Sequence, residues 1–208
     1  MSLFGRRIDQ RIASVALVSL SILSGCSDSS AGSGGDDVVG RDISVCELAS
    51  AGVVEDVVGQ QIKSILFWVR SPGDQHELKC SFSFVLSEDL FREVVVTYDY
   101  DHYGDIDVGE RSTFSSIAEH RSAAPVSVEG VEGQGVTVDN KGRPALVWSY
   151  PDGYGVSVVG GRPDPDDPIR QEELDVLIAL FERIGSRIPE VASGPDRPVT
   201  SYPTRRAS

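Results

Sequence analysis

Apolar residues recur at helical spacing in one stretch of the chain, and the stretch that follows has the apolar composition of a strand. In residues 51–58 the valines fall on one face of a helix, with Ser50 as an N-cap and Gly59 as a C-terminal stop. Residues 62–70 (IKSILFWVR) are β-branched and aromatic, which predicts a strand. The pattern therefore predicts a short helix followed by the first strand of a sheet.

The rest of the chain predicts further strands and one long helix. Strands are expected at 80–86, 91–100, 135–138, 144–150 and 154–159, with tight turns between the last three. Asp167 and Pro168 have the order of an N-cap and a first helical residue. A helix is expected from there to about Gly185, with an apolar face at helical spacing: Leu174, Leu177, Ile178, Phe181, Ile184 and Ile188. The fold class is α+β, an antiparallel sheet with a C-terminal amphipathic helix packed on it.

The first 25 residues read as an export signal. Three arginines precede an apolar run at 12–23, which is too short to span a bilayer. The run ends in Leu23-Ser24-Gly25-Cys26, which resembles the lipobox of bacterial lipoproteins. That resemblance implies cleavage before Cys26 and attachment of diacylglycerol and acyl chains such as palmitate to it. The location expected is the extracytoplasmic face of the cell membrane, with a secreted protein or an uncleaved anchor as alternatives.

Composition divides the remaining chain into three parts. Residues 26–41 are rich in Ser, Gly and Asp, which predicts a flexible tether after the lipidated cysteine. Residues 42–188 carry the predicted helices and strands and form the α+β domain. Residues 189–208 hold four prolines among small polar residues, which predicts a disordered tail.

Cys46 and Cys80 remain once Cys26 is assigned to the lipid, and they lie 34 residues apart. An even pair in an oxidising compartment favours a disulfide. It would link the short N-terminal helix to a strand. Two free thiols or a metal site are the alternatives, although two cysteines without neighbouring His or Cys make a poor zinc site.

Through these residues, the chain resembles an actinobacterial lipoprotein family, domain of unknown function 3558. The resemblance covers about residues 20–187 and rests on short motifs: the lipobox, Cys46-Glu47-Leu48, Gly59 and Cys80-Ser81-Phe82. Ala49 and Phe82 depart from the Leu and Trp that are common in the family. The resemblance implies an envelope location and a disulfide, and it implies no activity.

Charge narrows the choice of partners. The 208 residues include 19 basic and 32 acidic side chains, a net charge of -13. Loss of residues 1–25 removes three arginines and one aspartate, which leaves 16 basic and 31 acidic residues and a net charge of -15. Such a domain repels phosphate backbones, so no nucleic-acid partner is expected.

One acidic stretch resembles an EF-hand calcium loop. Its candidate ligands are Asp99, Asp101, Asp105, Asp107 and Glu110, with Gly104 at the sharp-turn position. Tyr103 stands where a ligand is usual, and a predicted strand precedes the loop where an EF-hand has a helix. Calcium is the one cofactor considered, and a solvated acidic loop is the alternative.

Aromatic residues offer a second candidate site. Trp148 and Tyr150 alternate along one predicted strand and therefore share a face. Tyr154 follows the turn and could lie across the hairpin from them. The three could stack on a sugar or a peptide, or they could belong to the core under the C-terminal helix.

Catalytic motifs are missing from the sequence. It contains no G-x-S-x-G, H-E-x-x-H, phosphate-binding glycine loop or C-x-x-C. The three histidines, His76, His102 and His120, stand outside any nucleophile motif. We therefore expect a non-enzymatic lipoprotein that presents a binding domain to an envelope protein or a cell-wall ligand. A calcium-binding or ligand-sensing module is the alternative, and a hydrolase built on His102 or His120 is a third hypothesis.

Overall fold

The computed structural model describes residues 38–85, 90–103, 105–107, 113–162, 164 and 166–203. Contacts divide the chain into two compact units, Met1–Gly35 and Asp36–Ser208, and every described residue belongs to the second. The described elements are β1 (Ser44–Val45), β2 (Ala49–Ser50), α1 (Ala51–Val58), β3 (Ile62–Arg70), β4 (Glu77–Phe84), β5 (Glu93–Tyr100), α2 (Phe114–Ala118), β6 (Ala124–Val126), β7 (Gln134–Asn140), β8 (Arg143–Ser149), β9 (Tyr154–Gly161), α3 (Gln171–Ile184), η1 (Gly185–Arg187), α4 (Ile188–Ala192) and β10 (Arg197–Tyr202).

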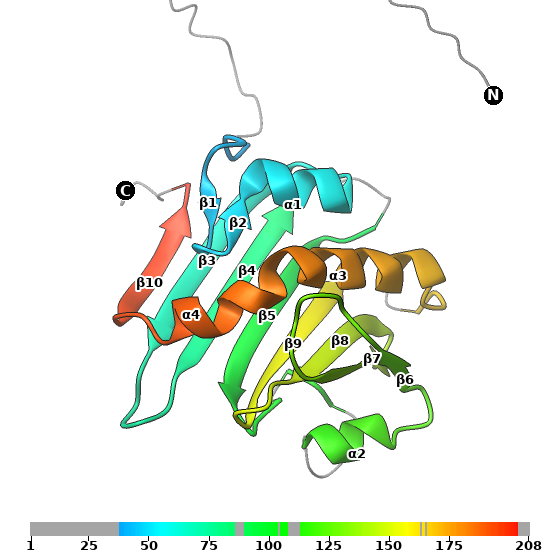
Figure 1. Ribbon diagram of the computed structural model, residues 1–208. Coiled ribbons are helices and arrows are strands. Elements are labelled where there is room, and N and C mark those ends of the chain that lie inside the picture. Colours follow the sequence, from blue (N-terminus) through cyan, green and yellow to red (C-terminus); the bar gives the residue numbers. More distant parts are fainter. Residues whose placement is uncertain are drawn as a thin grey trace, which may run out of the picture. The chain divides into compact units, whose positions relative to one another are not determined.

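Within the described part, one antiparallel sheet carries the fold. Its strands lie in the order β10-β3-β4-β5-β9-β8-β7-β6, and β1 pairs only with β2 (Figure 1). Hairpins join β3 to β4, β4 to β5, β7 to β8 and β8 to β9. The strands β3–β5 and the strands β7–β9 join into one sheet where β5 pairs with β9, for example at Val96 and Val158. The predicted α+β class with an antiparallel sheet is confirmed.

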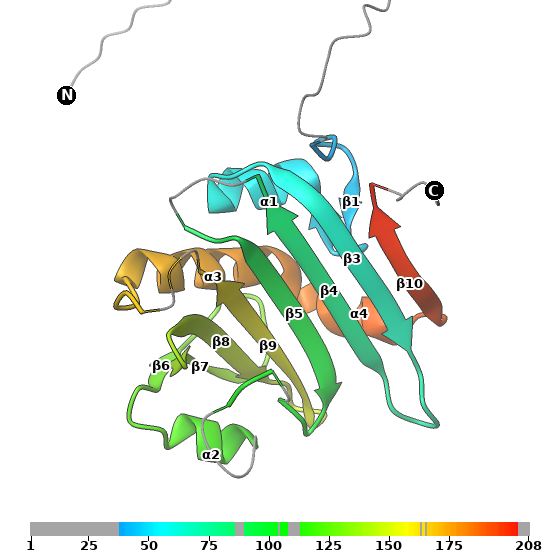
Figure 2. The same cartoon turned by 180° about the vertical axis from the view of Figure 1, so that it is seen from behind.

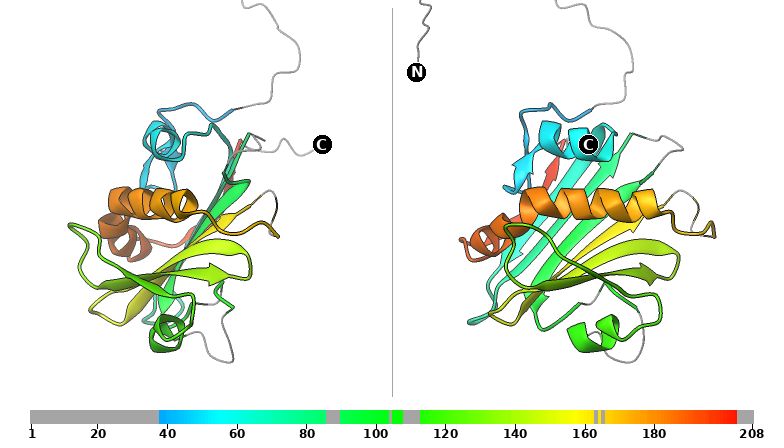
Figure 3. Two further views of the ribbon diagram at one scale, coloured as in Figure 1. Left: turned by 90° about the vertical axis from the view of Figure 1, so that its right-hand side faces the viewer. Right: turned by 45° about the vertical axis from the view of Figure 1, so that its right-hand side comes forward.

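Helices α1, α3 and α4 lie on one face of this sheet (Figures 1 and 3). The apolar face of α3 packs into the main core, where Leu177, Phe181 and Ile184 are buried. The ring of Phe181 lies 5.2 Å from that of Trp148 in β8. The predicted packing of the C-terminal helix on the sheet is therefore confirmed. No helix in the described ranges has the length and apolar character needed to cross a bilayer.

The opposite face of β7, β8 and β9 has its own smaller core, covered by α2 (Figure 2). Because side chains alternate along a strand, Val147 points to this face while Trp148 points to the main core. Ile117 of α2 is fully buried there, beside Val136 and Val159. The sheet is thus covered on both faces at its β7–β9 end.

The predicted disulfide is present. Cys46, in the turn between β1 and β2, is bonded to Cys80 in β4, and their Cα atoms are 5.9 Å apart. Both side chains are buried in the main core. As expected, the bond ties the segment that leads into α1 to a strand of the sheet.

The start of the long helix differs from the prediction. It begins at Gln171 with Arg170 as N-cap, three residues later than the Asp167–Pro168 pattern indicated. The carboxylate of Glu173 accepts from the backbone N–H of Arg170 at 2.7 Å. The guanidinium of Arg162 donates to the carbonyls of Asp167 and Pro168, which holds this segment outside the helix.

The predicted disordered tail is wrong for most of its described part. Residues 188–192 form α4 with Pro189 in its first turn, where a missing N–H costs nothing. Residues 197–202 form β10, which pairs with β3 at the edge of the sheet. Pro198 is tolerated there because one side of an edge strand has no pairing partner. Residues 204–208 lie outside the described residues.

The tether also ends earlier than predicted. The backbone N–H of Val39 donates to the carbonyl of Ile62 at 2.9 Å, and the Val39 side chain is buried. Arg41 forms an ion pair with Asp56 of α1 at 2.6 Å. The folded domain therefore includes residues 38–41, and the remainder of the predicted tether lies outside the described residues. Cys26 and the predicted signal lie outside them as well.

Candidate functional site

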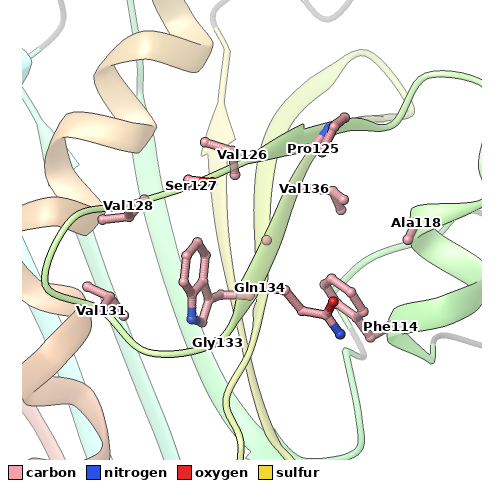
Figure 4. Close-up of a pocket in the computed structure, with 12 residues that line it drawn as sticks. Phe114, Ala118, Pro125, Val126, Ser127, Val128, Val131, Gly133, Gln134 and Val136 are labelled. Carbon is pink, nitrogen blue, oxygen red and sulfur yellow. The ribbon is translucent and has the colours of Figure 1, made fainter.

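A cleft of about 490 Å³ opens between α2 and the hairpin of β6 and β7 (Figure 4). Its volume falls within the range of small-molecule sites, which is about 300–1,000 Å³. The residues that line it are Phe114, Ala118, Pro125, Val126, Ser127, Val128, Val131, Gly133, Gln134, Gly135, Val136 and Trp148.

Helix α2 provides one wall of the cleft. Thr113 caps the helix by accepting from the N–H of Ser116 at 3.4 Å. Ile117 fixes its orientation by inserting fully into the smaller core. Phe114 and Ala118 are four residues apart and so lie on the same side of the helix, facing the cleft.

Trp148 is 1% exposed and borders the cleft from the main-core side of β7. Its indole N–H donates to the carbonyl of Glu132 at 2.9 Å, and its ring packs on Phe181. The ring fits against β7 because Gly133 and Gly135 have no side chains. A Cβ atom at Gly133 would lie 2.6 Å from the indole nitrogen, and one at Gly135 would overlap the ring. The two glycines are therefore required for this packing.

Polar and apolar groups contribute about equally to the exposed lining of the cleft, and no lining side chain is charged. Ser127 and Gln134 are the polar side chains among the lining residues, and none of those residues is ionisable. The chain as a whole carries a net charge of -13. A cleft without charged side chains on such an acidic protein suits a ligand that carries no net charge.

Of the three aromatic residues proposed from the sequence, the cleft contains Trp148. Tyr150 shares its face but is buried under α3, where its hydroxyl donates to the carbonyl of Gly185 at 2.7 Å. This burial raises the pKa of Tyr150 far above its usual value. The positions of Trp148 and Tyr150 match the core interpretation, and Trp148 borders the cleft from within that core.

Tyr154 lies in a separate aromatic stack. Its ring is parallel to that of Tyr98, with centroids 5.0 Å apart. Its hydroxyl accepts from the backbone N–H of His76 at 3.2 Å, which ties β9 to the turn before β4. Burial also raises the pKa of Tyr98. The three predicted aromatics therefore do not form one exposed patch.

The acidic stretch after β5 is held by contacts within the protein. Asp105 pairs with Lys79 at 3.5 Å and accepts from the hydroxyl of Thr97. Asp107 pairs with Lys141. Each of these two proposed calcium ligands thus has its own cation, and the cations come from different strands and turns.

Buried Asn140 fixes the backbone of the same stretch. Its side-chain amide donates to the carbonyl of Asp105 at 2.7 Å and accepts from the N–H of Asp107 at 2.9 Å. Asp99 instead accepts from its neighbouring backbone N–H at Tyr100. Asp101 is exposed with a φ of 44°.

No group of three or more His, Cys, Asp or Glu side chains in the described part of the chain is placed to hold a metal. Glu110 and Gly104 lie outside the described residues, so the proposed calcium loop stays a prediction.

Two of the histidines contact nearby serines, and the ring of His76 also stacks on that of Tyr154. A ring nitrogen of His76 lies 3.2 Å from the hydroxyl of Ser71, and one of His120 lies 2.8 Å from that of Ser122. Both pairs sit within single turns. Among the described residues, no carboxylate is within ion-pair distance of a histidine ring. Within the described part of the chain, neither serine–histidine pair therefore has a carboxylate that orients its imidazole ring.

Sequence patterns did not indicate the cleft. Phe114, Ala118 and Pro125 belong to a stretch without a long periodic signal, and they meet β7 only through long-range packing. Gly135 in β7, with Gly133 just before the strand, was the available signal, because glycine in a strand often marks a close approach. No family model, curated protein or solved structure matches this chain.

Proposed function

We propose that this protein is a lipid-anchored lipoprotein of the cell envelope whose domain binds an envelope protein or a cell-wall ligand without catalysing a reaction. The lipid would be attached to Cys26, and membership of the family of domain of unknown function 3558 is part of the proposal. The binding surface would be the cleft between α2 and β7.

The uncharged cleft carries this proposal. The cleft is a preformed hollow of about 490 Å³ without a charged side chain in its lining, on a chain with a net charge of -13. The disulfide between Cys46 and Cys80 suits an oxidising compartment outside the cytoplasm.

The placement of the cleft also supports presentation from a membrane anchor. The first described segment lies beside α1, where the N–H of Gly52 donates to the carbonyl of Arg41 at 2.8 Å. In Figure 1, α1 is at the top and α2 at the opposite end of the domain. A tether that joins the domain near α1 would therefore leave the cleft free on the far side.

The anchor and the binding surface need separate tests. Full-length protein in its own cells should incorporate labelled palmitate, and the variant Cys26→Ala should not. A photo-crosslinker in place of Ala118 should yield one discrete adduct in the intact envelope, whereas one in place of exposed Val199 on β10 should not. Lack of label would refute the anchor, and equal adducts at the two positions would refute the cleft as the binding surface.

A further inference from the structure

A second hollow, of about 100 Å³, lies over β4, β5, β9 and β8 on the face of the sheet that α1 and α3 leave open. Because Val94 and Val96 point to the main core, Val95 between them points to this open face. In Figure 2, β4 and β5 face the viewer with no described helix over them. The hollow shares no lining residue with the cleft between α2 and β7. Its lining residues are Lys79, Glu93, Val95, Asp105, Arg143, Val159 and Gly161.

Gly161 lies between two opposite charges of this hollow. It pairs with Glu93 of β5, and the register of β9 with β8 continues to Arg143 on its other side. Strands are spaced about 4.8 Å apart, so the backbones of Glu93 and Arg143 are roughly 10 Å apart. The position between them is open, because a Cβ at Gly161 would meet no atom closer than the carbonyl oxygen of Glu93, at 3.5 Å.

The two carboxylates of the hollow are held by partners on β4 and β5. The hydroxyl of Ser81 donates to Glu93 at 2.5 Å. Asp105 accepts from the hydroxyl of Thr97 and pairs with Lys79 at 3.5 Å. Both acids are therefore oriented on one side of the hollow, and the lysine is already neutralised by one of them.

The guanidinium on the β8 side has no such partner. Among the described residues, no carboxylate lies within ion-pair distance of Arg143. Glu93 lines the same hollow but is turned to Ser81. Opposite charges thus face one open space without contacting each other.

We infer that this hollow binds the head group of an α-amino acid, which carries an ammonium and a carboxylate on one carbon. The ligand carboxylate lies against Arg143, whose planar guanidinium matches it. The ligand ammonium donates to Glu93 and Asp105. A volume of about 100 Å³ holds roughly three water molecules, which suits such a head group and is well below that of a drug-sized site. The inference goes beyond the proposed function, because it concerns a separate surface.

Ligands with a single charge fit the hollow less well. An anion would pair with Arg143 but would also face the carboxylates of Glu93 and Asp105, which repel it. A simple cation would pair with those carboxylates but would face the guanidinium. A zwitterion meets attractive partners at both of its charges. Arg143 is exposed to water, which screens its attraction, so a dissociation constant of roughly 1 mM is expected.

The test is an NMR titration of the chain from Asp36 onward, which holds both hydrophobic cores and the disulfide. Glycine is the probe, at constant ionic strength. The backbone amide signals of Val95 and Gly161 should shift saturably. N-acetylglycine keeps only the carboxylate and glycinamide keeps only the ammonium, so each should bind about tenfold more weakly or worse.

Charge variants with matched controls assign each half of the ligand. Arg143→Gln should weaken glycine binding about tenfold and remove the preference for glycine over glycinamide. Glu93→Gln should remove the preference for glycine over N-acetylglycine. Arg183→Gln and Glu190→Gln remove exposed charges from α3 and α4 and should leave binding unchanged. A merely structural role for Arg143 or Glu93 would not change these preferences.

A variant of Gly161 tests the open space itself. Gly161→Ala is accommodated, since its Cβ makes only ordinary contacts. Gly161→Val extends two methyl groups into the hollow and should abolish glycine binding without lowering Tm.

The amino acid head group has two sources that the same titration separates. One is a free amino acid, and the other is the side-chain end of a diamino acid whose first amine is acylated in a peptide. Diaminopimelate acylated in this way by a peptide should bind about tenfold more tightly than glycine if the peptide is the ligand, and equally if the free amino acid is.

Three results would overturn the inference. The first is the lack of a saturable shift at Gly161 with glycine. The second is binding of N-acetylglycine or glycinamide as tight as that of glycine, which would show a site for a single charge. The third is unchanged glycine binding by Arg143→Gln or Gly161→Val. None of these results bears on the crosslinking at Ala118, which tests the proposed function separately.

Discussion

Removal of the buried carboxylate at Glu173 should strongly destabilise the domain. Its side chain is 1% exposed and that of its partner Arg162 is 5% exposed, with Nε and Oε1 2.7 Å apart. The same carboxylate caps α3 through the N–H of Arg170. The change Glu173→Ala therefore leaves a buried guanidinium without its countercharge and a helix without its cap.

The size of the effect follows from these contacts. Breaking a buried ion pair by removing one partner costs about 3–5 kcal/mol. Arg162 keeps the carbonyls of Gly142, Asp167 and Pro168 as acceptors, which places the pair at the lower end of that range. Loss of the cap adds about 1 kcal/mol, so we expect a total near 4 kcal/mol. For a domain of this size that corresponds to a fall in Tm of roughly 8–16 °C.

The assay is urea unfolding of the chain from Asp36 onward, followed by circular dichroism. Glu172→Ala is the matched control, because it removes an exposed carboxylate from the same first turn of α3. It should change the free energy of unfolding by less than about 0.5 kcal/mol. A loss below about 1.5 kcal/mol for Glu173→Ala would show that the ion pair does not hold the start of α3.

Three further predictions concern pH, the disulfide and calcium. Burial raises the pKa of Tyr98 and Tyr150 in the folded protein. The contribution of these neutral side chains to stability is therefore complete below about pH 10, the pKa of tyrosine in the unfolded chain, and it is lost above that pH because the unfolded chain ionises first. Unfolding measured from pH 9 to 11 should show this loss, and Phe at both positions should reduce it. Alanine at both Cys46 and Cys80 should lower the free energy of unfolding by about 4 kcal/mol, because the disulfide no longer closes a loop across a sequence separation of 34 residues in the unfolded chain. An unchanged denaturation midpoint would contradict this. Millimolar calcium should leave Tm unchanged because Asp105 and Asp107 have lysine partners, whereas a rise absent with magnesium would assign the 99–110 loop to calcium.

Local patterns predicted the elements whose signals lie within a few residues. Ser50 and Gly59 delimit α1 as expected, since capping depends on neighbours in sequence. The disulfide was also predictable, because an even pair of cysteines in an oxidising compartment favours a disulfide without any knowledge of the fold.

Long-range contacts account for the errors. β10 forms because β3 offers an open edge, which overrides a proline-rich composition. The start of α3 shifts because Arg162, eight residues before the N-cap, binds the carbonyls of the intervening segment. The cleft depends on how α2 meets β7 across the smaller core. No short sequence window contains this information.

Photo-crosslinking in the intact envelope tests most directly the central claim that the cleft between α2 and β7 is the binding surface. The account predicts one discrete adduct from a crosslinker in place of Ala118, which lines the cleft. A crosslinker in place of Val199, which is exposed on β10, should give none. Equal adducts at the two positions, or none at Ala118, would contradict the account.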